Sequence, residues 1–489
     1  MLILSRRLLC LLSLFLTACS LAPTYTRPPA PIPPKMAAPS AESQTSPNSV
    51  DADGMFHVAW QNFFHDRRLR ELIAAGLEQN RDLRLALLSI EEARAQYGVQ
   101  RADRLPQIGV EGSDTYQRDF ITKKDNPYET YKVMSVSTFE VDIFGRLKSL
   151  SDAALRRYLA TGEAAKAVRI SLISQVAQSY LAERLAAELL DLASRTLESR
   201  RTTFAFMERR VLSGQSSLLD MEQARGLVEA ASAEVAARKD ALVRAENALK
   251  LLLGSFDRQN LPPPIPLQEQ RFAELPQGLP STLLLRRPDI MESEYALRAA
   301  NADIGAARSA FFPSISLTGN LGYVSVELVE LFSANTGFWS FLPRINLPIF
   351  SGRRNTAELN LAEIRKKRAV VEYEQRIQRA FRETADALLT MTSLAEKLAA
   401  QRSWLQSQQL VLRLAMRNYT SGGTNYLAVL DAQRNVFEAE RELLATRQSQ
   451  LANDVSLYAA LGGGLDVTDT GPDDANTESR NGSATSNQQ

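Results

Sequence analysis

The chain contains two copies of one sequence pattern, and this duplication constrains its fold more than any other feature. Gly98 and Gly305 are 207 residues apart, as are Pro106 and Pro313. The offset stays at 206 to 208 residues in the other matched pairs, which are Asp82 with Asp289, Gly112 with Gly319, Ile143 with Ile349, Ser213 with Ser421, Leu219 with Leu427 and Leu253 with Leu461. A constant offset with shared turn residues predicts that one structural unit occurs twice.

Both copies predict the same succession of parts: a helix, a β-hairpin and a long helical hairpin. The copies are expected at 55–260 and 281–464, joined by a proline-rich linker at 261–280. The β-hairpins are expected at about 107–144 and 314–350, and the tips of the helical hairpins at about 211–216 and 420–426. The predicted fold class is therefore mixed α and β, with four strands and long helices in each protomer.

The strand-like segments alternate between apolar and polar residues. In SISLTGNLGYV, Ile315 and Leu317 fall on one face, and Ser316 and Thr318 fall on the other. Segments of about ten residues with this pattern are typical of outer-membrane β-barrels. A strand of a soluble β-sandwich shows the same alternation. Aromatic residues that flank the strands favour the membrane interpretation.

The helical stretches are expected at about 146–210, 216–253, 353–417 and 426–461. They are rich in strong helix formers and almost free of proline. Ile377, Phe381 and Leu388 belong to an apolar series with spacings of three and four residues, which is typical of a coiled-coil seam. Because buried charges are expensive in lipid, we expect these charged helices to project into water.

Four strands are too few to close a barrel. An open sheet in lipid leaves two unpaired edges, at several kcal/mol per unsatisfied group, and barrels of this type begin at about eight strands. Two copies of the chain would give eight strands and a barrel filled by side chains, whereas three copies would give twelve and an open lumen. Lys132, Glu140 and Arg344 on the polar faces favour a watery interior. We therefore expect a homotrimer with one 12-stranded outer-membrane β-barrel and one periplasmic α-helical barrel.

The N-terminus predicts a lipoprotein signal at 1–18. Arg6 and Arg7 precede a short apolar run, and the small residues Thr17 and Ala18 precede Cys19. This pattern predicts cleavage before Cys19 and its lipidation, although an ordinary secretory signal with an incidental cysteine has similar features. Residues 19–54 are rich in proline and serine and are expected to form a tether, and the polar residues 465–489 are expected to form a disordered tail.

The composition offers no chemistry for an enzyme. The formal charge is +1, which disfavours a nucleic-acid partner, because phosphate binding needs a basic face. The two histidines, His57 and His65, have no neighbours in metal-ligand spacing. The sequence also lacks a nucleophile elbow, a zinc-protease motif and a phosphate-binding loop. We therefore expect no catalytic residue, no cofactor and no metal site.

These features together resemble the TolC/OprM family of outer-membrane efflux channels. The motifs NRDLRLA, EARAQY, RPDIMESE, IGAARSAFFPSISLTG and NYLAVLDAQR are similar to the lipoprotein (NodT/CusC-like) branch, which includes copper and silver channels. The resemblance covers essentially the whole mature chain. It implies a homotrimer in the outer membrane that docks with a periplasmic adaptor and an inner-membrane pump of the resistance-nodulation-division type.

The resemblance also implies a gate near the second hairpin tip. Positions that match Leu427, Asp431 and Arg434 line or brace a closed periplasmic aperture in the family. Leu427 and Asp431 are four residues apart and so share a helix face. The alternative is that Asp431 and Arg434 form an ordinary solvated surface pair. The first copy differs here, since Gln223 matches Asp431 and Asp220 matches Ala428, so an acidic role for Asp220 is a weaker expectation.

The two tips are the expected docking surface for the adaptor. Their glycines also serve the turns, and both roles are compatible. The residues concerned are Leu212, Ser213 and Gly214 in the first tip, and Ser421, Gly422 and Gly423 in the second.

The function implied by the resemblance is that of a passive exit duct for drugs and other toxic organic compounds. The first alternative is the same duct for heavy-metal cations such as copper or silver. The second alternative is a structural coiled-coil lipoprotein of the envelope, which the amphipathic strands disfavour.

Overall fold

The computed structural model describes residues 21–33, 58–117, 128–255, 261–275 and 281–464. The predicted signal 1–18, the lipidation candidate Cys19, much of the expected tether and the tail 465–489 lie outside these ranges. The chain divides into two compact units. Unit 1 comprises Met1–Ala30, Ala86–Ala165 and Asp289–Arg376, and unit 2 comprises Pro31–Leu85, Lys166–Pro288 and Ile377–Gln489.

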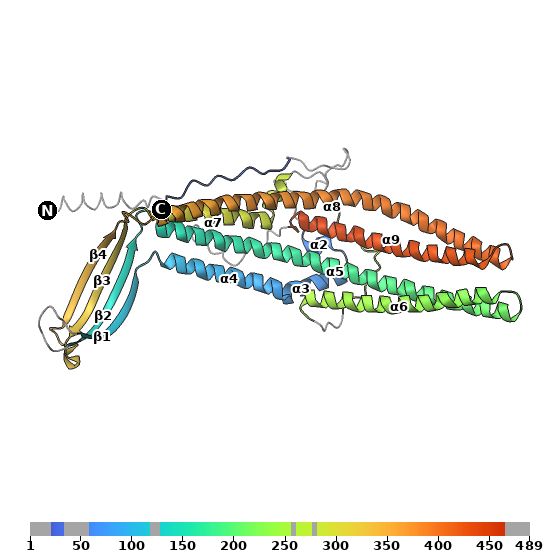
Figure 1. The fold of residues 1–489 in the computed structure, drawn as a ribbon, viewed down its shortest axis with the longest axis horizontal. Helices are drawn as coiled ribbons and strands as arrows, with labels where there is room; N and C mark the ends of the chain where they lie inside the picture. Colours follow the sequence, from blue (N-terminus) through green and yellow to red (C-terminus); the bar gives the residue numbers. More distant parts are fainter. Residues whose placement is uncertain (1–20, 34–57, 118–127, 256–260, 276–280, 465–489) are drawn as a thin grey trace, which may run out of the picture. The chain divides into compact units, whose positions relative to one another are not determined.

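Both copies share one order of main elements, namely a helix, two strands and two long helices (Figure 1). The first copy contains α2 (Trp60–Phe63), α3 (Arg67–Gln79), α4 (Arg81–Ala102), β1 (Gln107–Gln117), β2 (Tyr128–Val141), α5 (Arg146–Leu212) and α6 (Leu218–Leu253). The second contains η1 (Ser281–Arg286), α7 (Pro288–Ser309), β3 (Ser314–Ser325), η2 (Leu328–Glu330), β4 (Gly337–Asn346), α8 (Arg354–Thr420) and α9 (Tyr426–Ala460). The predicted fold class of four strands and long helices in a duplicated protomer is confirmed.

The long helices of the two copies match closely. Both α5 and α8 contain 67 residues, and α6 and α9 contain 36 and 35. Proline is absent from all four, so every residue in them keeps a backbone N–H donor. Among the described helices, none combines the length and the apolar character that a bilayer span requires.

The strands of unit 1 form one antiparallel sheet in the order β1-β2-β3-β4 (Figure 1). The two hairpins come from different copies, and β2 pairs with β3 to join them, with Val133 opposite Tyr323. Gly322 lies at this junction, where an added Cβ would be 2.1 Å from the carbonyl oxygen of Val133. The outer strands β1 and β4 are the edges of this sheet.

The register collects apolar side chains on one face of the sheet. Directly paired residues share a face, so Ile315 stands beside Ile345, and Leu321 stands beside Trp339. Val110 and Trp339 are 79% and 77% exposed, so this face is not covered within the protomer. The residues of this face are Ile108, Val110, Val133, Phe139, Val141, Ile315, Leu317, Leu321, Tyr323, Trp339, Phe341 and Ile345.

The opposite face of the sheet is more polar. The Nδ2 atom of Asn320 donates to Ser340 Oγ at 3.0 Å. Arg146, at the start of α5, donates two hydrogen bonds to the carboxylate of Glu140 on β2, at 2.9 and 2.7 Å. The alternation fails in the middle of β2, where Met134 and Val136 lie on this face.

Unit 2 has an aromatic and polar core that includes the described part of the linker. Phe63 stacks on Tyr458 with ring centroids 4.3 Å apart. Asp66, which is 5% exposed, accepts hydrogen bonds from Tyr180 Oη and Gln270 Nε2, both at 2.7 Å. The linker residue Gln270 is therefore fixed against the helices of this unit.

Candidate functional site

The first hairpin tip is a Schellman motif, the hydrogen-bonding pattern that often ends a helix at glycine. Gly214 adopts a left-handed conformation, with φ of +71°. The amide of Gln215 donates to the carbonyl of Arg210 at 2.8 Å, and the amide of Gly214 donates to Val211 at 2.9 Å. These bonds satisfy carbonyl groups that the end of α5 would otherwise leave without partners.

The second tip has the same geometry 208 residues later. Gly422 has φ of +78° and donates to the carbonyl of Tyr419 at 3.1 Å. The amide of Gly423 donates to the carbonyl of Asn418 at 2.8 Å. The duplication therefore extends to individual hydrogen bonds at the ends of α5 and α8.

The helices that leave the tips begin with capping side chains. Ser217 accepts a hydrogen bond from the amide of Asp220 at 3.1 Å and so caps α6. The sequence predicts a serine or threonine cap in both tips. In the second tip the cap is Asn425, which accepts from the amide of Ala428 at 3.3 Å, because asparagine suits this position equally well.

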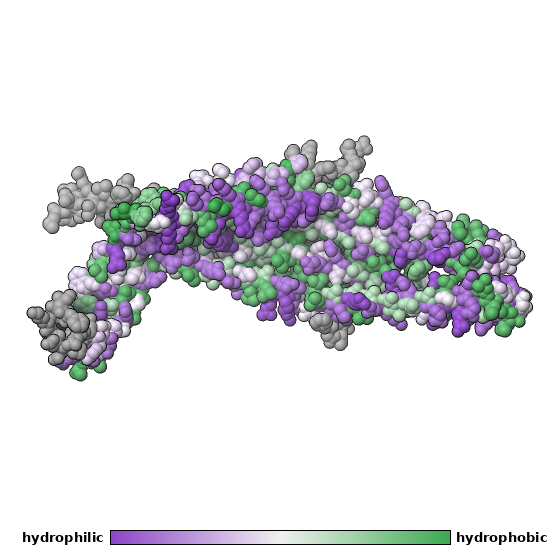
Figure 2. Space-filling view, in the orientation of Figure 1, coloured by the Kyte–Doolittle hydropathy of each residue, from purple (hydrophilic) through white to green (hydrophobic). Residues whose placement is uncertain are grey.

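The residues predicted to dock a partner are exposed in both tips. Leu212 is 83% exposed. The other five are exposed as well, namely Ser213, Gly214, Ser421, Gly422 and Gly423. Figure 2 shows hydrophobic residues at the ends of the two hairpins, where Leu212, Leu218 and Leu219 are exposed. This geometry is compatible with docking, which remains a prediction.

The predicted gate residues lie on the open side of α9. Leu427 is 52% exposed, whereas its neighbours Tyr426 and Val429 are buried. Asp431 and Arg434 form an ion pair within one turn of the helix, and their side chains are 48% and 72% exposed. Within one protomer this pair is therefore a solvated surface pair, which contributes little to stability.

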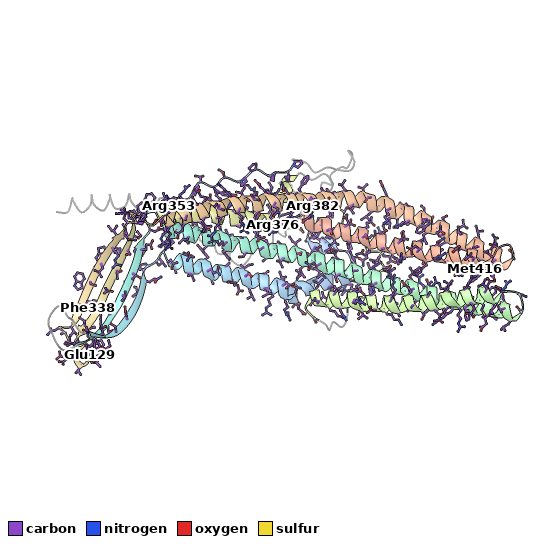
Figure 3. All side chains as sticks on the ribbon, in the orientation of Figure 1. Glu129, Phe338, Arg353, Arg376, Arg382 and Met416 are labelled. Carbon is purple, nitrogen blue, oxygen red and sulfur yellow. The ribbon has the colours of Figure 1, made fainter. Side chains whose placement is uncertain are left out.

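A buried cluster joins the two helical hairpins just behind the tips. Tyr419 Oη lies 3.3 Å from the sulfur of Met207, and the rings of Tyr419 and Tyr426 are 5.4 Å apart. Ala224 and Val429 complete the buried part of this cluster. Figure 3 labels Met416, which packs against the cluster near the end of α8. No prediction from the sequence includes these contacts, although two tyrosines flank TSGGTN in the second tip.

Two arginines border this cluster. The guanidinium of Arg210 lies 5.3 Å from the centroid of the Tyr419 ring, within cation–π range. Burial lowers the pKa of Arg200, whose Nη1 donates to the carbonyl of Leu227 at 3.1 Å. Burial, followed by the nearby Tyr419 and Asp220, raises the pKa of Tyr426 to about 12. Tyr426 is therefore neutral at physiological pH.

Asp220 takes a structural position at the start of α6. Its carboxylate accepts a hydrogen bond from Ser216 Oγ at 3.3 Å, and it lies in the first helical turn, where the helix dipole favours negative charge. Among the described residues, no group of three or more acidic, histidine or cysteine side chains could hold a metal ion. Cys19 lies outside the described residues.

Comparison with known proteins gives a family match in both copies of the repeat. The family model described as "Outer membrane efflux protein" matches residues 72–255 and again residues 279–463. The two matches correspond to the two copies that the constant offset predicts.

Three curated relatives cover almost the whole chain. "Cation efflux system protein CusC" of Escherichia coli O6:H1 is 45% identical over 92% of this chain and 97% of its own length. "Probable outer membrane lipoprotein SilC" of Salmonella typhimurium is 43% identical over 94% of this chain and 98% of its own length. "Toluene efflux pump outer membrane protein TtgC" of Pseudomonas putida is 41% identical over 93% and 95%.

Solved structures share the fold of this chain. A crystal structure of CusC superposes with a TM-score of 0.82 at 43% identity, covering 91% of this chain and all of that one. The open state of the Neisseria gonorrhoeae MtrE outer membrane channel superposes with a TM-score of 0.83 at 36% identity, covering 91% of this chain and 99% of that one.

Proposed function

This chain belongs to the outer membrane efflux protein family, and from that premise we propose that it is the exit duct of a tripartite efflux system. In this role a periplasmic adaptor and an inner-membrane pump of the resistance-nodulation-division type deliver cargo to the duct. An efflux family agrees with the prediction that the chain is not an enzyme, so the duct itself is passive. The structural-lipoprotein alternative explains neither the amphipathic sheet nor these relatives.

The observation that carries the proposal is the four-stranded sheet with one apolar face and one polar face. The apolar face suits contact with lipid, because its alternating side chains are large and uncovered in the protomer. The polar face suits a watery lumen. In a bilayer the edges β1 and β4 need partners, and we propose that β1 of one protomer pairs with β4 of the next in a closed homotrimer.

We propose that Cys19 carries the lipid that anchors the chain to the outer membrane. The small residues Thr17 and Ala18 directly before Cys19 support this, and so does the name of the relative SilC, a probable outer membrane lipoprotein. The lipid would act together with the barrel, since acyl chains hold a protein on a membrane without spanning it.

The proposed gate arises when the exposed face of α9 is repeated three times around one axis. Three copies of Leu427 would form a hydrophobic constriction, and three copies of Asp431 would form a ring of carboxylates. Two such charges about 6 Å apart repel each other by roughly 0.7 kcal/mol in water, and by several times more where water is scarce. Arg434 pairs with Asp431 in each protomer and offsets this repulsion, so the closed aperture can accommodate the ring of carboxylates.

The adaptor is proposed to bind the two tips. Leu212 offers an exposed apolar contact, and the backbone of both Schellman motifs fixes the tip residues in one conformation. A rigid tip loses little conformational entropy when it binds a partner.

The first proposed cargo class is drugs and other toxic organic compounds, and the name of the relative TtgC, a toluene efflux protein, supports it. The second candidate is heavy-metal cations. The higher identities to CusC, named for cation efflux, and to SilC favour this class. Both classes fit a passive duct, because a shared lumen leaves selection to the pump.

The test is conductance together with export. Purified protein in planar bilayers should form pores of uniform conductance, and a detergent-solubilised sample should show β structure. A strain that lacks the chain should become sensitive either to toluene and antibiotics or to copper and silver salts, and this sensitivity identifies the cargo. Absence of conductance from a properly folded, membrane-inserted sample would remove the channel proposal.

A further inference from the structure

Residues 21–30 lie against α7 and α8 within unit 1, although their composition predicts a free tether. Figure 1 shows this segment in dark blue beside the two helices. Asn301 Nδ2 donates to the carbonyl of Pro23 at 2.7 Å, and Arg308 Nη1 donates to the carbonyl of Leu21 at 3.3 Å. The side chains of α7 thus bind the backbone of this N-terminal segment, which we call the strap.

A buried carboxylate holds the strap from the side. The Glu294 side chain is 3% exposed, and its two oxygens lie 2.7 Å from Arg27 of the strap and 2.6 Å from Arg298 of α7. Tyr25 of the strap donates to the same carboxylate at 3.3 Å, and the Arg298 guanidinium lies 5.0 Å from the centre of the Tyr25 ring. A carboxylate this deeply buried requires paired charges, and one of the two is supplied by the strap.

Two further contacts complete the set of interactions that hold the strap, which we call the clamp. Arg27 Nε donates to Tyr373 Oη of α8 at 3.0 Å. A Cβ added at Gly305 would lie 2.8 Å from the Cβ of Ala22, so the strap passes directly over bare helix backbone at that point. A side chain at position 305 would collide both with the strap and with Ser149, whose Oγ lies 2.7 Å from the same added Cβ.

The duplication provides an internal comparison for this site. At the offset of 207 residues, Glu294 matches Leu87 and Arg298 matches Glu91 on α4. Leu87 is 51% exposed, and a Cβ added at Gly98, which matches Gly305, would have no atom within 4 Å. Glu294 and Arg298 therefore occur only in the copy that binds the strap, so the shared fold does not explain them, whereas Arg308 has a counterpart in Arg101.

We propose that the strap fixes the position of the N-terminal lipid by clamping residues 21–27 onto the end of α7 that leads into the sheet. Arg308 binds Leu21 one residue before α7 ends, and β3 begins at Ser314. Cys19 precedes Leu21 by two residues, so their Cα atoms are at most about 7.6 Å apart. If residues 19–54 were an unattached tether, the lipid could lie anywhere within roughly 100 Å of the point where the folded chain begins. This proposal rests on the proposed lipidation of Cys19.

The experiment measures the distance between two nitroxide spin labels in the full chain. One label is placed at Thr26→Cys on the strap and the other at Ala296→Cys on α7, where both native side chains are exposed. The mature lipidated chain has no other free thiol, because Cys10 leaves with the signal and lipid caps Cys19. The clamp is tested by Arg27→Gln, which alters only the strap, and by Glu294→Gln. Glu292→Gln is the matched control on α7, since Glu292 pairs with Arg376 at 3.9 Å instead.

In trimers diluted with unlabelled chain, so that each contains at most one labelled protomer, the parent chain and the Glu292→Gln control should give one narrow distance distribution. Arg27→Gln and Glu294→Gln should each broaden it. The same results should appear in a chain with Cys19→Ser and a plain signal, because the clamp is built by protein contacts. Any of three results would overturn the proposal. They are a broad distance distribution in the parent chain, a narrow one in Arg27→Gln, and a narrow one that appears only in the lipidated chain. Intact mass reports lipidation separately, so a missing lipid would disprove the anchor, and the Cys19→Ser chain, which lacks this thiol, would still report the strap.

Discussion

At the scale of single residues, the candidate gate depends on side chains that are unremarkable in one protomer. Asp431 and Arg434 form an exposed ion pair of a kind that contributes about 0–1 kcal/mol to stability. Their proposed importance comes from threefold repetition around the axis of the channel. Function at this site should therefore be sensitive to substitutions that leave protomer stability almost unchanged.

Replacing Asp431 and Arg434 together by Ala should raise single-channel conductance and make cells leaky to large antibiotics. The reason is that alanine shortens two side chains that project into the proposed constriction in each of the three protomers, so the closed aperture becomes wider. Asp240 and Arg244 form a matched exposed ion pair on α6, and their double replacement by Ala should leave conductance unchanged. Equal conductance of the gate variant and the parent would remove these residues from the gate.

Asp454 should make the stability of unit 2 depend on pH. Burial raises its pKa from 3.8 to about 6, although the charge of Arg447 acts to lower it. The folded chain holds this proton more tightly than the unfolded chain does. The protonated carboxyl therefore makes its full contribution to the free energy of unfolding below about pH 4, and this contribution is lost as pH rises through 6. The shift is equivalent to about 3 kcal/mol.

Asp454→Asn keeps a neutral side chain at every pH. Its melting temperature should therefore exceed that of the parent by an amount that grows between pH 4 and 7. Asp240→Asn, at an exposed position of α6, is the control and should show no such trend. If the melting temperatures of Asp454→Asn and the parent differed by a constant amount across this pH range, the raised pKa of Asp454 would be contradicted.

At the scale of elements, local chemistry predicted some features and not others. The glycines of both tips and the serine cap of α6 were predictable, because a helix end and a turn are determined by neighbouring residues. The cap of α9 was predicted as serine or threonine and is Asn425 instead. The contact of Tyr419 with Met207 joins residues 212 positions apart, and no local pattern reports it. The docked strap was missed for a similar reason, since its binding partners lie on distant helices.

Gly422→Ala should loosen the second tip. Alanine at φ of +78° is disfavoured by about 1 kcal/mol, so the last turn of α8 should exchange its amide hydrogens several-fold faster. Gly226→Ala is the matched control in the interior of α6, where a Cβ meets no atom within 4 Å. This change should stabilise the helix, because alanine is the better helix former. Slower exchange at the tip of Gly422→Ala would contradict the capping role.

At the scale of the whole molecule, the duplication predicted the architecture, and the strand count predicted the need for assembly. Alternation identified the apolar face of the sheet, although Met134 and Val136 interrupt it on β2. The pairing of β2 with β3 joins strands from different copies, and it became visible only in the structure. The edges β1 and β4 are where the proposed trimer must close.

Disulfide cross-linking between these two edges tests whether three protomers close one barrel. One cysteine is placed along β1 and one along β4 of the same chain, in a series of registers, and the membranes are oxidised before denaturing electrophoresis. At least one register should give covalent dimers and trimers, with no larger species, because three protomers close the ring. Three results would contradict the shared 12-stranded barrel. They are covalent species that stop at dimers, covalent species larger than trimers, and monomers in every register.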